Sequence, residues 1–243
     1  MAFFAGFDTE VFPGLDCMTW LRANSNLRWC GYYLAPAPNR SPTGWPGRYE
    51  ALKADWGVVP IYVGQQDPRT ATAHYKPSSL LTAERGAIDA GDAVKLAWQD
   101  QFPGGTFVYL DWEYGGLDGA GARDYVKAWA AAVAAEGTFM PGVYCSHNTA
   151  SGVVKLLNTI DPAPAARLWC WKVPSADNHP YLGDLGAVPA PDPAGCGFAG
   201  AIAWQRDQNT TVTLPDGAPA KSLKVDFSTA ASADPAAPPA ARA

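Results

Sequence analysis

The sequence has few charged residues: Asp, Glu, Lys and Arg make up only 17% of its 243 residues, and the formal net charge is −5. It contains no run of Lys and Arg and no basic stripe. Proteins that bind nucleic acid through its phosphates carry such a patch, so we expect no nucleic-acid partner.

Long apolar runs are also missing, since none approaches the ~20 residues that cross a bilayer. We therefore expect no membrane span. The first residues, Met-Ala-Phe-Phe-Ala-Gly-Phe, lack the basic region and the long apolar region of a signal peptide. Removal of an export signal, another route out of the cell and retention inside it all remain open at this point.

Motifs for several kinds of chemistry are absent as well. There is no P-loop and no G-x-S-x-G elbow, and Gly119 and Gly121 are followed by Asp124 where a dinucleotide fingerprint has its third glycine. The three histidines lie far apart in the sequence without the spacing of metal ligands. We expect neither a cofactor nor a metal.

The five cysteines include no C-x-x-C pair. Free cysteines are usually buried as small apolar side chains, which is the interpretation we favour. One disulfide would fit the count, although its pairing cannot be derived. Cys145 and His147 share one face of a predicted strand, which leaves a cysteine mechanism as a weaker alternative.

Aromatic residues, in contrast, are abundant: the chain has 10 Trp, 10 Tyr and 9 Phe, and 48% of it is hydrophobic. This composition excludes wholesale disorder. The 24 Gly and 22 Pro predict many turns. A core does not need so much Trp, so the surplus requires a second explanation.

Short β-branched and aromatic runs alternate with helical patterns over most of the chain. Strands are predicted at residues 3–9, 28–35, 58–64, 106–113, 141–146, 167–173, 199–206, 210–214 and 222–227. Helices are predicted at residues 13–25, 48–56, 81–99, 122–136 and 151–160. Thr82 is a plausible N-cap of the third helix and Gly137 a suitable residue to end the fourth.

This order predicts an α/β fold, an irregular TIM-type barrel of five βα units followed by about three strands with few helices. A doubly wound sheet is the structural alternative. Residues 1–229 would form one barrel domain, and the Ala/Pro-rich residues 230–243 a disordered tail.

Acidic residues stand at the ends of three predicted strands, where barrels place their active sites. Asp111 and Glu113 are two apart on one strand, so they share a face. Closure of the sheet makes the first and last strands neighbours, which would bring Asp8 and Asp226 together. Four carboxyl groups would then line one cup.

Crowded carboxylates raise one another's pKa, so that one acts as an acid while another stays ionised. Glycoside hydrolysis uses such a pair, and the two-residue spacing suits a retaining enzyme. Asp8 or Asp226 alone could equally be a turn or cap residue, as we expect for Glu10. A carboxylate metal site is a further alternative that no ligand motif supports.

Aromatic side chains near the strand ends could ring this cup and stack on sugars. Alternation sends about half of them to the opposite face. The predicted substrate-binding aromatics are Tyr33, Tyr62, Tyr144, Trp171 and Trp204.

Four motifs, in order, carry a resemblance: Gly6-Phe7-Asp8-Thr9, Tyr109-Leu110-Asp111-Trp112-Glu113, Ala203-Trp204-Gln205 and Val225-Asp226. The chain resembles, over residues 3–229, a glycoside-hydrolase-like TIM-barrel family of unknown function that is related to the family-25 lysozymes. The residues 36–47 and 174–197 have no match in the lysozymes, and we expect these two loops to shape the groove.

The resemblance implies a lysozyme-like muramidase. Glu113 would be the proton donor and Asp111 the assisting carboxylate that orients the N-acetyl group, with Asp8 and Asp226 flanking them and Gln205 among the substrate-binding residues. The substrate would be the glycan strand of peptidoglycan, and the protein would act at the cell envelope or as a secreted protein, delivered by phage lysis or a secretion system. A catalytically inactive or weak carbohydrate-binding pseudoenzyme of the envelope is the alternative.

Overall fold

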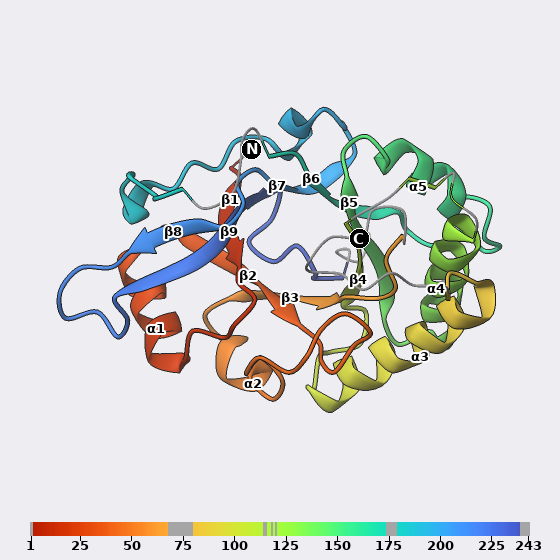
Figure 1. Cartoon of the computed structure of the whole chain (residues 1–243), viewed down its shortest axis with the longest axis horizontal. Helices are drawn as coiled ribbons and strands as arrows, with labels where there is room; N and C mark the ends of the chain where they lie inside the picture. Colours follow the sequence, from red (N-terminus) through yellow and green to blue (C-terminus); the bar gives the residue numbers. More distant parts are fainter. Residues whose placement is uncertain are drawn as a thin grey trace, which may run out of the picture.

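The chain forms an irregular TIM-type barrel, as the strand and helix pattern predicts (Figure 1). The structure is a computed structural model of the whole chain. It describes residues 2–67, 80–113, 116, 117, 119, 121–173 and 179–238.

Five strand–helix units come first in the chain, and strands with little helix follow. The strands are β1 (Phe4–Asp8), β2 (Leu27–Tyr33), β3 (Gly57–Tyr62), β4 (Phe107–Trp112), β5 (Met140–Ser146), β6 (Arg167–Trp171), β7 (Ala201–Gln205), β8 (Thr210–Thr213) and β9 (Ser222–Ala230). The helices are α1 (Leu15–Asn24), α2 (Tyr49–Leu52), α3 (Ala83–Gln99), α4 (Ala122–Glu136) and α5 (Ala150–Leu157). After β6 the only helices among the described residues are two short 3-10 helices, η2 (Leu185–Ala187) and η3 (Pro193–Cys196).

One strand closes the barrel from the other direction. Strands β1 to β7 pair in parallel, each with the next along the chain. Strand β9 runs antiparallel between β7 and β1 and hydrogen-bonds to both. Strand β8 pairs with β9 and forms with it a hairpin, at the left of Figure 1 in blue. The first and last strands are therefore neighbours, as expected for a closed sheet.

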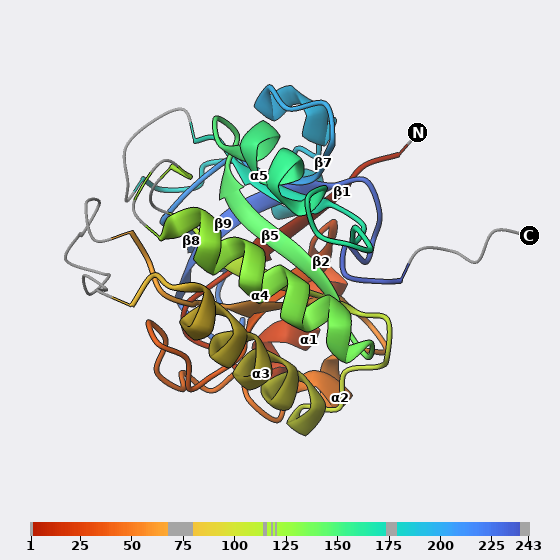
Figure 2. The same cartoon turned by 90° about the vertical axis from the view of Figure 1, so that its right-hand side faces the viewer.

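The two predicted helix signals act as expected. The Thr82 hydroxyl accepts a hydrogen bond from the backbone N–H of Arg85 at 3.1 Å, which caps α3. Gly137 ends α4 with a φ of +83°, a left-handed conformation that suits glycine. Helices α3 and α4 lie side by side on the outside of the barrel (Figure 2).

Large aromatic side chains fill the barrel interior. Trp169 lies at the centre, with its ring centroid 5.1 Å from that of Trp29 and 5.2 Å from that of Tyr144, both in edge-on contact. A Cβ atom at Gly142 would come within 2.7 Å of the Tyr109 ring, and one at Gly6 would overlap the Trp29 ring. Glycine at these two positions leaves the space that the rings occupy, so much of the aromatic surplus is core.

The end of the chain differs from the expected disordered tail over residues 230–238. Ala230 pairs with both Phe4 and Ala203, so β9 continues beyond the predicted Phe227. Further on, the Ala236 carbonyl accepts from the Phe107 backbone N–H at 2.9 Å, and the Pro235 carbonyl accepts from the Tyr109 hydroxyl at 3.0 Å. The reason is tertiary: the segment after β9 supplies hydrogen-bond partners to the N-terminal ends of the barrel strands, which its Ala/Pro composition does not reveal. Residues 239–243 lie outside the described residues.

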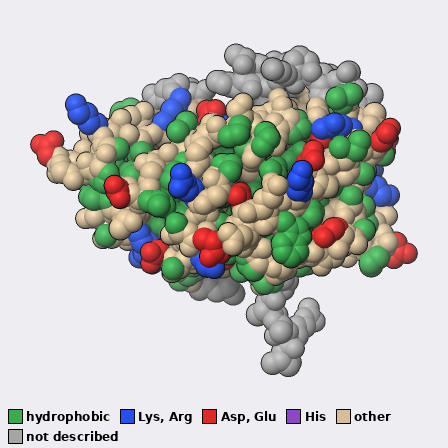
Figure 3. Space-filling model, turned by 90° about the horizontal axis from the view of Figure 1, so that it is seen from below, with side chains coloured by type: hydrophobic (Ala, Val, Ile, Leu, Met, Phe, Trp, Pro, Cys, Tyr) green, Lys and Arg blue, Asp and Glu red, His purple; other side chains and the backbone are tan. Residues whose placement is uncertain are grey.

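The remaining predictions concern cysteines and the surface. All five cysteines are free and buried, as the favoured interpretation predicts. No helix among the described residues is long and apolar enough to cross a membrane. Basic and acidic side chains are interspersed on the face that holds α1, α2 and α3 in Figure 1, seen from below in Figure 3, and neither sign gathers into a patch there.

Candidate active site

A cavity of about 600 Å³ opens at the C-terminal ends of the barrel strands. All four predicted carboxylates line it, as do three of the predicted binding residues. These seven are Asp8, Asp111, Glu113, Asp226, Tyr33, Tyr144 and Gln205. The site is called the acidic cavity below. These seven residues come from six different strands or their ends, so the acidic cavity exists only in the folded barrel.

Asp8 and Asp226 come together at the seam of the barrel. They are directly paired residues of the antiparallel strands β1 and β9, so their side chains leave the sheet on the same face. Asp8 is 4% exposed. The Tyr33 hydroxyl donates to Asp8 Oδ1 at 2.7 Å, which fixes the carboxyl group from the neighbouring strand β2.

Asp226 ends a chain of hydrogen bonds across β7. The Tyr144 hydroxyl donates to Gln205 Oε1 at 2.6 Å, and Gln205 Nε2 donates to Asp226 Oδ2 at 3.0 Å. The backbone N–H of Asn209 donates to Asp226 Oδ1 at 2.5 Å. Both carboxyl oxygens of Asp226 therefore accept hydrogen bonds, which orients this group firmly.

Side chains from neighbouring elements hold the backbone carbonyls of Asp111 and Glu113. Gln66 Nε2 donates to the Asp111 carbonyl at 2.7 Å, and Trp171 Nε1 donates to the Glu113 carbonyl at 3.2 Å. Asp111 is buried and lies opposite Tyr144 in the β4–β5 register, whereas Glu113 is partly exposed just beyond the end of β4. The two carboxylates thus occupy different depths of the acidic cavity.

Burial and mutual repulsion shift the acidity of these groups. Burial raises the pKa of Asp8 to about 7, with the Glu113 charge acting in the same direction and the Tyr33 hydrogen bond and Arg40 opposing it. Burial, and then the Glu113 charge, holds the pKa of Asp111 well above its ordinary value. Burial, and then Asp8, does the same to the pKa of Asp226. A proton is therefore available inside the acidic cavity near neutral pH.

Two carboxyl oxygens in the acidic cavity are buried without a hydrogen-bond partner among the described residues: Oδ2 of Asp8 and Oδ1 of Asp111. A buried polar atom without a partner is costly, which suggests a role for a bound molecule. These atoms can accept from hydroxyl or amide N–H groups of a ligand, or carry a proton and donate.

Two of the predicted binding aromatics face the wrong way. Tyr62 is fully buried beside Asp89 and Asp92 of α3, whose charges, after burial, raise the pKa of its hydroxyl. Trp204 packs outside the barrel on η3, where a Cβ at Gly195 would lie 2.9 Å from its ring. Alternation along the strand explains both, because their neighbours Ile61 and Gln205 point into the acidic cavity instead.

The other three predicted binding aromatics do not form an open surface on which sugars could stack. Trp171 is not among the residues that line the acidic cavity, and its indole supports the Glu113 backbone. Tyr33 and Tyr144 do line it, but they are only 9% and 7% exposed. They present hydroxyl groups to Asp8 and Gln205 rather than open faces.

Sequence reasoning missed several contributors. Trp169 forms part of the cavity wall from the interior, and Gln66 holds the Asp111 backbone. Arg40 and Asn39 come from the loop of residues 36–47, which was expected to shape the groove but offered no motif. Glu10, expected to be a turn residue, also lines the cavity and forms an ion pair with Arg40 at 3.1 Å. The signal in the sequence that could have indicated Arg40 is its position as the one charged residue of this Pro-rich loop. Of the second loop expected to shape the groove, residues 174–178 lie outside the described residues.

The candidate site matches a known family. The sequence profile of the Rv2525c-like, glycoside hydrolase-like domain matches residues 20–222, most of the chain. The chain belongs to this family. No curated protein sequence matches it significantly.

Solved structures with the same fold are distant in sequence. An uncharacterized protein of B. stearothermophilus has a TM-score of 0.62 at 19% identity, over 93% of this chain and 95% of that one. The Tat-secreted protein Rv2525c of Mycobacterium tuberculosis gives 0.54 at 14% identity, over 93% and 94%. A bacterial lysozyme from Streptomyces coelicolor gives 0.53 at 14% identity, over 94% and 92%. This glycoside hydrolase-like domain therefore shares the lysozyme barrel fold.

No set of three or more His, Cys, Asp or Glu side chains in the described part of the chain is arranged to hold a metal ion. Two of the carboxylates, Asp8 and Asp226, instead accept hydrogen bonds from hydroxyl and amide groups. The arrangement offers acid–base chemistry and hydrogen bonding to a polar ligand.

Proposed function

We propose that this domain hydrolyses β-1,4 glycosidic links in the glycan strands of peptidoglycan, as a lysozyme-like muramidase. The observation that carries the proposal is the set of four carboxyl groups in one cavity, two of which have buried oxygens without a partner among the described residues. Carboxyl pairs in a shared site are what glycoside hydrolysis requires. The fold shared with a Streptomyces lysozyme supports the same reaction.

In this proposal Glu113 protonates the glycosidic oxygen as the bond to the anomeric carbon breaks. Its partly exposed position at the mouth of the acidic cavity, above the buried Asp111, suits contact with a leaving sugar. Trp171 keeps the Glu113 backbone in place. We further propose that the oxygen of the 2-acetamido group attacks the anomeric carbon as the leaving sugar departs. Water then opens this intermediate with Glu113 acting as the base, so that the configuration at the anomeric carbon is retained.

Asp111 acts on the substrate through its buried oxygen. Oδ1 has no partner among the described residues and would accept the N–H of a 2-acetamido group, which orients that group beside the anomeric carbon. Asp8 and Asp226 flank the pair: Asp8 offers a second such oxygen, and Asp226 is held by Gln205 and Asn209. Amino sugars carry the matching N–H and hydroxyl donors.

The place of action in this proposal is outside the cytoplasm, at the cell envelope. The Tat-secreted protein and the bacterial lysozyme that share the fold support this location. The route by which the protein leaves the cell, phage lysis or a secretion system, is a separate question that export assays can answer.

A second candidate is a carbohydrate-binding protein without turnover. It is favoured by the firm hydrogen bonding of the cavity side chains, since Tyr33 already satisfies one oxygen of Asp8 and both oxygens of Asp226 accept hydrogen bonds. Such prearranged groups can bind sugar hydroxyls without a chemical step.

Release of muropeptides from purified cell walls separates the two candidates. The enzyme proposal predicts release by the wild type and a loss of about 10²–10⁴-fold in Glu113→Gln, which keeps the shape but cannot donate the proton. Glu50→Gln is the matched control, because Glu50 is an exposed residue paired with Lys53. Undiminished activity of Glu113→Gln would remove the acid assignment. Wall binding without any release, unchanged in Glu113→Gln, would favour the binding protein.

A further inference from the structure

The positively charged side chain of Arg40 forms part of the wall of the acidic cavity and lies on a hydrogen-bonded turn. Arg40 lines the cavity from the loop between β2 and α2, and its side chain is only 12% exposed. The turn is closed by two backbone hydrogen bonds between Ala37 and Arg40, at 2.9 and 3.0 Å. Next to it, Asn39 Nδ2 donates to the Gly64 carbonyl at 2.8 Å. The position of the guanidinium group is therefore set by the fold.

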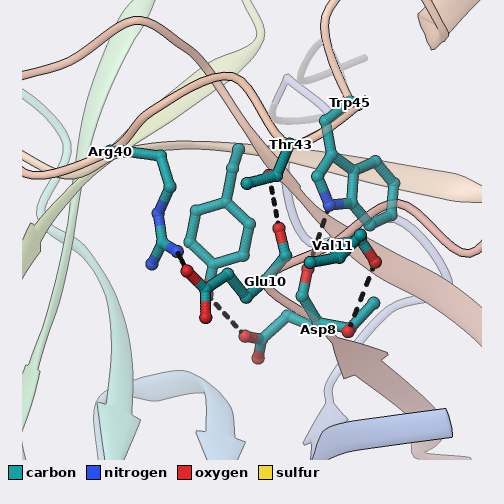
Figure 4. Close-up of polar contacts among 8 residues, drawn as sticks. Asp8, Glu10, Val11, Arg40, Thr43 and Trp45 are labelled. Atoms are coloured by element: carbon teal, nitrogen blue, oxygen red, sulfur yellow. Dashed lines mark hydrogen bonds and ion pairs between the residues drawn. The ribbon is translucent and has the colours of Figure 1, made fainter. Parts of the chain in front are cut away.

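The guanidinium group of Arg40 stacks on a ring and forms an ion pair. Arg40 Cζ lies 4.2 Å from the centroid of the Tyr33 ring, whose hydroxyl holds Asp8. Nη1 of Arg40 lies 3.1 Å from Oε1 of Glu10. Figure 4 shows the charged groups of Arg40 and Glu10 turned toward each other. Stacking fixes the plane of the guanidinium group and thereby the direction in which it offers its N–H groups.

Glu10 combines an anchored backbone with an exposed carboxylate. The Thr43 hydroxyl donates to the Glu10 carbonyl at 2.5 Å, and Trp45 Nε1 donates to the Thr9 carbonyl at 2.9 Å (Figure 4). The Glu10 side chain is nevertheless 71% exposed. An ion pair with one partner this exposed contributes little to stability, so its carboxylate can leave without disturbing the backbone.

We propose that Arg40 and Glu10 form an exchangeable carboxylate site, in which an acidic group of the ligand replaces the Glu10 carboxylate on Arg40. A guanidinium group matches a carboxylate with two parallel hydrogen bonds. The other cation that lines the cavity among the described residues, Lys224, is exposed near the start of β9. Arg40 is therefore the cation that is fixed by stacking and by a turn, and it can hold an acidic group in a defined position.

The inference rests on the proposed function and names its substrate class. A glycan whose sugars carry carboxylates, such as the lactyl ether of N-acetylmuramic acid, would bind in preference to a neutral polymer of N-acetylglucosamine. Both polymers carry 2-acetamido groups, and they differ at O3, where N-acetylmuramic acid has the lactyl ether in place of a hydroxyl. The effect of substituting Arg40 on each polymer therefore assigns the difference in affinity to this residue.

Calorimetric binding in the Glu113→Gln background, where turnover does not interfere, tests the site. The two probes are an alternating N-acetylglucosamine–N-acetylmuramic acid tetrasaccharide and chitotetraose. We expect the acidic tetrasaccharide to bind at least tenfold more tightly, and Arg40→Gln to remove about tenfold or more of its affinity while changing that of chitotetraose less than twofold. Glu10→Gln, which removes the competing carboxylate, should strengthen binding of the acidic tetrasaccharide severalfold.

Two further variants serve as controls. Arg48→Gln makes the same charge change on the same loop, at a residue that contacts the Gly44 carbonyl and does not line the cavity, and should alter neither affinity. Arg40→Lys keeps the charge and should retain part of the selectivity, which guards against a folding defect in Arg40→Gln.

The possible outcomes are distinct. Equal losses for both tetrasaccharides in Arg40→Gln would assign Arg40 to the support of Tyr33 and Asp8 and overturn the carboxylate site. Equal affinities in the parent protein would overturn it too, while leaving the proposed function in place. Failure of both tetrasaccharides to bind, together with no release from walls, would overturn the proposed function and this inference with it.

Discussion

Asp8 and Asp226 are directly paired across β1 and β9, the two strands whose hydrogen bonds close the barrel. Two acids 218 positions apart in the sequence thus share one face at the seam. They differ in their surroundings: both oxygens of Asp226 accept hydrogen bonds, whereas one oxygen of Asp8 has no partner among the described residues. Asp226 is therefore the oriented carboxyl group of the pair, and Asp8 is the one that can gain or lose a proton or bind a ligand.

The raised pKa of Asp8 makes the stability of the fold depend on pH. The pKa is about 7 in the folded protein and ordinarily near 3.8, so between these values the folded state holds more protons than the unfolded state. This contribution to stability is complete below about pH 4 and is lost as the pH rises through 7. Asp8→Asn should therefore raise the free energy of unfolding at pH 8, on the order of 2–4 kcal/mol, and change it little at pH 4.

Thermal unfolding followed from pH 4 to 8 checks this expectation. Asp216→Asn, in an exposed turn, is the control and should shift the melting temperature equally at both ends. A gain for Asp8→Asn that is the same at pH 4 and pH 8 would contradict the assignment.

Gln205 should be essential to the order of the cavity. Gln205→Leu leaves the buried Tyr144 hydroxyl without its acceptor and Asp226 Oδ2 without its donor, which should cost about 2–4 kcal/mol in the free energy of unfolding. Tyr144→Phe should cost less, about 1 kcal/mol. In the double variant the two costs should not add, because the orphaned hydroxyl is gone. Urea denaturation of all four proteins measures the coupling, and strict additivity would refute it.

Trp171 should affect catalysis without changing affinity, given the proposed function. Trp171→Phe removes the hydrogen bond to the Glu113 carbonyl, and the proton donor loses part of its positioning. We expect kcat to fall about three- to tenfold with KM nearly unchanged. Trp204→Phe is a matched control, since its indole makes a similar bond, to the Lys172 carbonyl at 3.0 Å, outside the barrel. Equal effects of the two substitutions would exclude a role specific to Glu113.

Arg167 should hold the end of the chain against the barrel. Its Nη1 donates to the Pro235 and Ala237 carbonyls at 3.1 and 2.6 Å, and its Cζ lies 3.8 Å from the Phe107 ring centroid. Arg167→Ala should lower the free energy of unfolding by about 2–4 kcal/mol and speed the hydrogen exchange of the Phe107 amide, which is bonded to Ala236. Lys155→Ala on the exposed face of α5 should change stability by less than about 0.5 kcal/mol. Normal protection of the Phe107 amide in Arg167→Ala would show that the tail packs without this arginine.

Periodicity accounts for most of what could be predicted about the fold. Alternation of strand and helix patterns, the Thr82 cap and the Gly137 terminus are local properties, so the five βα units and the helix-poor end of the barrel follow from them. The packing of residues 231–238 could not be predicted. This segment is held by hydrogen bonds from Phe107, Tyr109 and Arg167, which lie more than sixty residues away in the chain.

The candidate site divides in the same way. The face shared by Asp111 and Glu113 follows from the period of a strand, and the meeting of Asp8 and Asp226 follows from closure of the sheet. Which aromatic side chains point into the barrel depends on the register of each strand. An error of one position in the predicted register assigns a side chain to the wrong face of the sheet, as happened for Tyr62 and Trp204.

By itself, the sequence determined the barrel and the four acids at one end of it, because backbone periodicity and strand order are encoded locally. Only the tertiary structure decided how these acids are held, which of their oxygens lack partners in the described chain, and that Arg40 stands among them. Those properties arise from burial and from contacts between distant loops, which set the pKa of a carboxyl group and the position of a cation. Neither the pKa nor the position of the cation can be derived from residue type and spacing.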